Sequence, residues 1–124
     1  MSMISDIATQ LQTAGAGTLA TNIFYSVAPD SPDALVAVLD TGGPEQDQYL
    51  PLYDKTFQVY VRATSYANGI AKVEAIRSAL HQKVAVTYGS TFFHYILAIS
   101  AGGHIGRDDK GRDEFTINFR CKTR

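Results

Sequence analysis

The 124-residue chain has a single cysteine, no tryptophan and no long hydrophobic run. One cysteine, Cys121, excludes an intrachain disulfide and fits a reducing compartment, where we expect the thiol to be a small buried hydrophobe. No apolar run approaches the roughly 18 residues that a membrane-spanning helix needs. Because the N-terminal segment also lacks the basic-then-apolar order of a signal peptide, we expect no membrane association and no secretion by that route.

Residue patterns with catalytic or metal-binding spacing are also missing. The histidines His81, His94 and His104 are far apart, and none has a second ligand three or four positions away. The chain has no Gly-x-Ser-x-Gly elbow, and its Gly106-Arg107 step leads toward a strand, not into the helix that follows a phosphate-binding loop. We therefore expect a non-catalytic protein without cofactor or metal.

The composition is that of an ordinary folded domain. Hydrophobic residues make up 45% and charged residues 19%, far from the composition of disordered chains. At this length a chain buries enough surface for one core. We expect a single domain over residues 1–124, with no linker and no internal repeat.

Charge is divided unequally along the chain, although the net charge is only −1. Residues 1–54 contain seven acidic and no basic residues, whereas residues 55–124 contain eleven basic and five acidic ones. Two interpretations follow. Acidic loops can fold back onto basic strands of the same subunit, or opposite faces can carry opposite signs and favour head-to-tail association into a ring.

Apolar periodicity predicts two helices. Ile4, Ile7 and Leu11 have the spacing of a short amphipathic N-terminal helix, and a longer pattern predicts the principal helix over residues 67–83. Strand-like runs occur at residues 22–28, 34–39, 55–63, 84–88, 91–99 and 114–122. This order predicts an α+β fold: a mostly antiparallel β-sheet with the principal helix packed on it.

The segment between the last two strand-like runs holds four glycines and is predicted to be a loop over residues 101–111. Within it we expect a polar hairpin turn, in which Asp108 and Asp109 accept hydrogen bonds from their own backbone and Gly111 takes a positive φ. The strand that follows alternates Phe115 and Phe119 with cations. The phenylalanines are therefore expected in the core and the cations on the surface, which disfavours an RNA-binding sheet.

Two polar loops flanked by strands, residues 42–53 and 102–112, are the expected contact regions for other subunits or partners. Tyrosines cluster around the first loop, and exposed tyrosines are common anchors of protein interfaces. The candidate interface residues are Gly42, Gly43, Gln48, Tyr49, Tyr53, Arg107, Asp108, Asp109, Lys110 and Arg112.

Residues 104–119, with the string Ile-Gly-Arg-Asp-x-Lys-Gly-Arg, resemble the C-terminal signature of phage minor capsid proteins of the siphophage tail-terminator or tail-completion group. The resemblance extends upstream to residues 57–63, then to Tyr66, Gly69 and the helix that follows, and so covers nearly the whole chain. The distinctive part is the C-terminal string. The rest is similar in pattern only.

The resemblance implies a structural virion subunit, assembled in the host cytoplasm and located at the head-tail interface. It implies self-association, usually as a hexameric ring, that caps the tail tube protein and meets a head-completion or connector protein. DNA would be only a cargo passing through the ring. No catalytic residue is carried over from the group. Two alternatives remain: a head-completion or connector protein, and a small nucleic-acid-binding domain that uses the basic C-terminal segment.

Overall fold

The computed structural model describes residues 3–43 and 52–124, and it confirms the α+β architecture. Two helices, α1 (Met3–Thr13) and α2 (Tyr66–Leu80), accompany seven strands. The strands are β1 (Ile23–Tyr25), β2 (Leu35–Gly42), β3 (Tyr53–Ala63), β4 (Lys83–Tyr88), β5 (Thr91–Ala98), β6 (Gly103–Arg107) and β7 (Asp113–Thr123).

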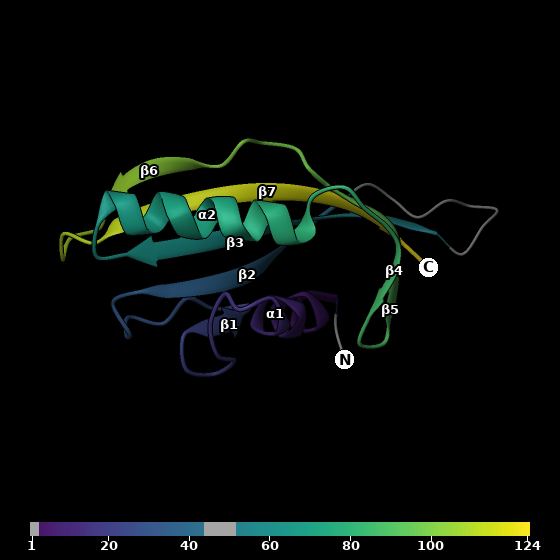
Figure 1. Ribbon diagram of the computed structural model, residues 1–124, viewed down its shortest axis with the longest axis horizontal. Helices are drawn as coiled ribbons and strands as arrows, with labels where there is room; N and C mark the ends of the chain where they lie inside the picture. Colours follow the sequence, from purple (N-terminus) through teal and green to yellow (C-terminus); the bar gives the residue numbers. More distant parts are fainter. Residues whose placement is uncertain (1–2, 44–51) are drawn as a thin grey trace.

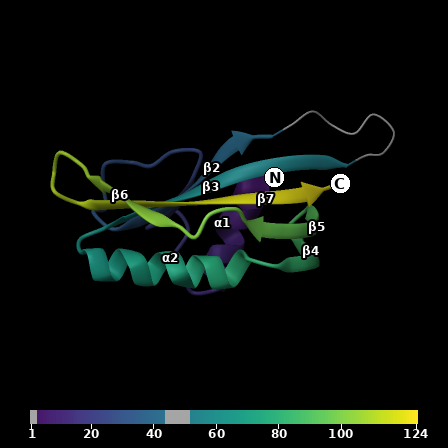
Figure 2. The same ribbon diagram turned by 90° about the horizontal axis from the view of Figure 1, so that it is seen from above.

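All seven strands form one sheet in the order β1-β2-β3-β7-β5-β4, with β6 paired to β7 beside β5. Among the seven strands of the described residues, the β1–β2 pair is parallel and the other pairs are antiparallel. The longest ladder joins β3 to β7, from Tyr53 opposite Thr123 to Ala63 opposite Asp113. Figure 1 shows β4 and β5 turning toward α1, so the sheet is curled, and Figure 2 shows α2 running alongside β7. The β3–β7 ladder is the central strand pair of the fold, and its two ends lie at the two ends of the molecule.

The core lies on one face of the sheet, beneath both helices. Phe115, Ile117 and Phe119 of β7 are fully buried, and their cross-strand partners on β3 are equally buried. Phe57 stacks on Phe119 with ring centroids 5.0 Å apart. Each such side chain contributes about 1.5–3 kcal/mol through burial. The predicted alternation of core phenylalanines and surface cations is confirmed for β7.

Helix α1 buries the predicted apolar side of the N-terminal segment, including Ile7 and Leu11. It is also tied to the distant β4–β5 hairpin. Asp6, which is 1% exposed, accepts a 2.6 Å hydrogen bond from the hydroxyl of Thr91. The hairpin turn approaches this carboxylate so closely that a Cβ at Gly89 would lie 2.2 Å from Asp6 Oδ1. These contacts hold the curled end of the sheet over the N-terminal helix.

Helix α2 begins where Ser65 caps it, accepting a hydrogen bond from the backbone N–H of Asn68 at 3.2 Å. It ends at Leu80, earlier than the predicted residue 83, because Gln82 takes a positive φ of 59° and the chain enters β4 at once. His81 follows the helix, and its Nδ1 accepts a hydrogen bond from the backbone of Ala98.

Two strand predictions are wrong. Residues 103–107, predicted as part of a loop, form strand β6, because pairing with β7 supplies the hydrogen bonds that the local sequence gives no reason to expect. Strand β1 is shorter than the predicted 22–28, because Ser26 takes a positive φ of 65° and the chain leaves the sheet. Strands β5 and β6 both pair with the same edge of β7, and residues 99–102 connect the two strands.

Candidate functional site

The turn between β6 and β7 is organised by Asp108, one of the two carboxylates that the sequence predicts for this role. Asp108 Oδ1 accepts hydrogen bonds from the backbone N–H groups of Lys110 and Arg112, at 3.0 and 2.9 Å. Gly111 has a φ of 77° and donates its N–H to the Asp108 carbonyl. Asp109 differs from the prediction: it is exposed, and in the described part of the chain its side chain makes no hydrogen bond.

The buried side chain of Arg112 binds this turn to the β1–β2 connection. Its side chain is 8% exposed, and its guanidinium lies 2.7 Å from Asp108, 3.0 Å from Asp30 and 3.2 Å from Asp33. Hydrogen bonds to Asp108 and Asp30 raise the pKa of Arg112 above its usual range. The pKa of Asp30 is lowered by Lys110 and Arg112 in return. The cluster fastens the β1–β2 connection to the β6–β7 hairpin.

A second buried arginine holds the same connection. Arg62, at the end of β3, is 5% exposed and donates to the carbonyls of Pro29, Pro32 and Asp33 at 2.7, 2.6 and 3.2 Å. The acidic first half of the chain is thus partly neutralised by basic residues of the second half. Of the two interpretations of the charge division, the intrachain one is confirmed for Asp30 and Asp33.

Asp113 forms a separate buried cluster at the start of β7. It is 3% exposed, and its Oδ1 lies 2.9 Å from His104 Nε2 and 3.1 Å from Arg107 Nε. The bond to His104, followed by that to Arg107, lowers the pKa of Asp113. The His104 ring packs edge-on against Tyr66 and Phe115. In residues 3–43 and 52–124, no three His, Cys, Asp or Glu side chains are grouped as metal ligands.

The other predicted contact region lies at the opposite end of the β3–β7 ladder. Gly42 and Gly43 are exposed, with positive φ values of 86° and 142°. Tyr53 is 39% exposed, and Lys55 lies over its ring at 5.2 Å. Gln48 and Tyr49 fall outside the described residues.

The described residues of the first predicted loop, Gly42, Gly43 and Tyr53, are therefore separated from the second loop and do not join it in one patch. At about 3.3 Å per residue, the ladder places them roughly 33 Å apart. Arg112 and Asp108 are engaged inside the chain. The candidates that remain exposed to a partner are Gly42, Gly43, Tyr53, Arg107, Asp109 and Lys110. Within the chain, Arg107 is paired with Asp113 and Lys110 with Asp30.

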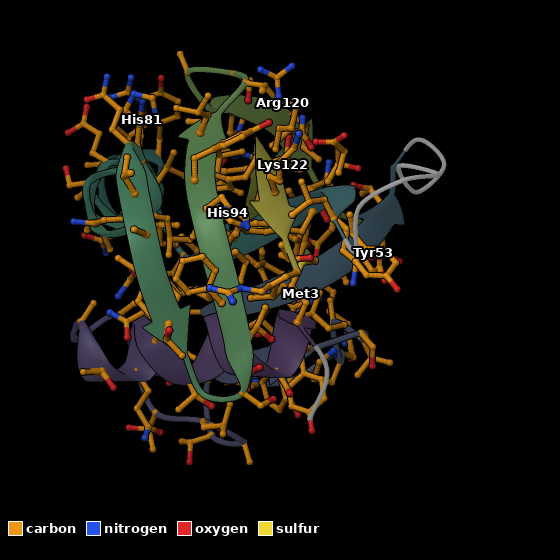
Figure 3. The ribbon with its side chains drawn as sticks, turned by 90° about the vertical axis from the view of Figure 1, so that its right-hand side faces the viewer. Met3, Tyr53, His81, His94, Arg120 and Lys122 are labelled. Atoms are coloured by element: carbon orange, nitrogen blue, oxygen red, sulfur yellow. The ribbon has the colours of Figure 1, made fainter. Side chains whose placement is uncertain are left out.

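The sheet face opposite the helices is open and polar over β3 and β7. Gln58 bonds to Asn118 across the strands at 3.1 Å, and the hydroxyl of Tyr60 donates to Glu114. Partial burial, with that carboxylate beside it, raises the pKa of Tyr60 to about 12. Figure 3 shows Arg120 and Lys122 on this outer side of β7, away from α1 and Met3.

One feature of this face was not predicted from the sequence. Strand β5 places Tyr95 directly opposite Lys122 and Leu97 directly opposite Arg120. Residues opposite one another in a ladder share a face. Aromatic and cationic side chains therefore lie on the same outer sheet face, the aromatic ones from β5 and the cationic ones from β7. The sequence signal for this arrangement was the alternation of side chains along residues 91–98. A bulge at His94 interrupts that alternation.

Neither helix of the described residues has the length and apolarity required to cross a membrane.

Comparison with known proteins agrees with this architecture. The sequence model of the bacteriophage tail terminator protein family matches residues 10–124. A chain from the virion of a native gene transfer agent particle has the same fold, with a TM-score of 0.71 and 16% identity over 98% of this chain and 94% of that one. A second solved structure matches with a TM-score of 0.64 and 13% identity over 99% and 97% of the two chains.

No curated protein sequence matches the chain. The family match spans nearly the full length, and the family is a structural, non-enzymatic one of the virion tail. The chain belongs to the bacteriophage tail terminator protein family.

Proposed function

We propose that this chain caps the tail tube and forms the head-tail joint as a ring of identical subunits, with six as the expected number. The observation that carries the proposal is the family match over residues 10–124. In this role the protein ends polymerisation of the tail tube protein on one side. It offers a surface to a head-completion or connector protein on the other, and DNA passes through the ring.

The sheet has two unlike ends, which suits head-to-tail association. In the described part of the chain, the sheet order ends with β1 on one side and β4 on the other. Strand β1 is three residues long and parallel to its neighbour, whereas β4 is a hairpin strand in which Val84 is 69% exposed. Interfaces between different patches of identical subunits generate rings when the rotation closes.

The two contact loops fit two different partners. Gly42, Gly43 and Tyr53 lie at one end of the β3–β7 ladder, and Arg107, Asp109 and Lys110 lie at the other. A subunit between tube and head needs contacts at two separated ends. We assign one loop to the tube side and the other to the head side, with β1 and β4 left for neighbouring subunits.

The experiment is a pelleting assay with assembled tail tubes, followed by negative-stain microscopy of the pellet. Arg107→Glu and Tyr53→Ala test the two ends separately, and Arg77→Glu on α2 is the control because Arg77 is also an exposed arginine. The proposal expects wild-type protein on one end of each tube, and loss of tube binding in one of the two end variants alone. Wild-type protein that never associates with tubes contradicts it.

A further inference from the structure

We propose that the outer sheet face around Arg120, Lys122 and Arg124, here called the β7 basic row, binds the phosphate backbone of duplex DNA. This contact goes beyond passage of DNA through a ring, because it assigns a binding surface. It does not depend on how many subunits assemble.

The row is regular. Arg120 and Lys122 occupy alternate positions of β7, so their side chains leave the same face at an interval of about 6.6 Å, and Arg124 directly follows the last residue of the strand. Arg120 and Arg124 are exposed, and in the described part of the chain neither forms an ion pair. Lys122 is half-buried and lies 3.6 Å from the half-buried Asp54. Arg120 and Arg124 therefore keep positive charges that the described part of the chain does not neutralise, and the charge of Lys122 is partly offset by Asp54.

The surroundings of the row match nucleic acid better than a protein partner. The guanidinium of Arg124 lies over the ring of Phe92 at 4.3 Å, which holds that cation in place on the face. Beyond Arg120 the face continues with amide and hydroxyl side chains such as Asn118 and Thr116, which commonly donate to phosphate and sugar oxygens. A series of donors along one strand fits a linear series of phosphates.

Neither α1 nor α2, the helices of the described residues, covers this face. Both helices pack on the other side, where Phe115 and its neighbours are buried. In Figure 3, Arg120 and Lys122 stand clear of α1. A duplex can approach the row without displacing any helix.

The test is fluorescence anisotropy of a short labelled DNA duplex titrated with wild-type protein at several salt concentrations. If three phosphates are contacted, the affinity falls by roughly 40-fold between about 50 and 200 mM salt, and unlabelled duplexes of different sequence compete equally. Arg120→Glu is expected to weaken binding and to reduce the salt slope by roughly 0.9, the share of one contact.

Arg77→Glu is the matched control, because it makes the same charge change at an exposed arginine on α2. Light scattering on each variant ensures that any loss of binding does not come from an altered oligomer. Equal losses in both variants would overturn the assignment to this face, as would wild-type protein that does not bind DNA. If Arg120→Glu abolished tail-tube association while leaving DNA binding intact, the row would contact an acidic protein surface and the proposal would fail.

Discussion

The ring of Phe115 occupies the space that a side chain at Gly69 would need, since a Cβ there would lie 1.9 Å from Phe115 Cε1. This contact sets how closely α2 approaches β7. Gly69 has an ordinary helical φ, so glycine is required at this position for space and not for backbone conformation.

Gly69→Ala is expected to lower the free energy of unfolding by about 1–3 kcal/mol, because overpacking outweighs the gain in helix propensity. Urea denaturation measures it. Gly103→Ala is the control, since nothing lies within 4 Å of a Cβ at that position and its stability should stay near that of wild type. A Gly69→Ala protein as stable as Gly103→Ala would show that α2 can shift freely on the sheet.

Acid is expected to loosen the β6–β7 hairpin. The pKa of Asp113 is lowered in the folded protein by His104 and Arg107, so its contribution to stability is present above the ordinary value of 3.8 and is lost as pH falls through the folded pKa. Thermal unfolding followed between pH 6 and pH 3, a range that spans the ordinary carboxyl pKa of about 3.9, should show a falling midpoint. In the Asp113→Asn variant the unfolding midpoint should fall less steeply between pH 6 and pH 3. An equally steep fall would contradict a role of Asp113 in acid unfolding.

The two hairpin arginines should behave differently when replaced by alanine. Arg112→Ala leaves Asp30, Asp33 and Asp108 without their shared cation and should lower the unfolding midpoint and loosen the β1–β2 connection. Arg107→Ala removes a side chain that is 68% exposed and should leave the midpoint almost unchanged. Limited proteolysis and thermal scans compare the two. Equal midpoints would mean that the Arg112 cluster does not hold the loop.

Cys121 should be inert while the protein is folded. It is fully buried beside Met3, with its Sγ 3.6 Å from the methionine sulfur, and burial raises its pKa to about 12. A thiol reagent at pH 8 should leave native protein unmodified and label it fully in denaturant. Rapid labelling of native protein would place β7 outside the stable core.

The sequence predicted those parts of the fold that local periodicity specifies. Alternation in β7 identified Phe115, Ile117 and Phe119 as core, and helical spacing identified both helices. Strand β6 could not be predicted, because its residues show no alternation and its formation depends on pairing with β7. The end of α2 depended on the backbone conformation of Gln82, which no apolar pattern encodes.

The sequence predicted which charged residues form the turn of the candidate site, but not which distant residues contact them. The charged turn at Asp108 followed from turn chemistry alone. The burial of Arg112 did not, because its partners Asp30 and Asp33 are about eighty residues away in sequence. The meeting of Tyr95 with Lys122 likewise depends on which strand becomes the neighbour of β7.

We propose that copies of this chain form the ring that ends the tail tube. Light scattering on the purified protein, with microscopy of the protein mixed with assembled tubes, tests this proposal most directly. We expect a mass near six times 13.5 kDa for the protein in solution, and a ring visible by microscopy at one tube end. A chain that stays monomeric at high concentration and low salt, and that leaves tubes unbound, would contradict it.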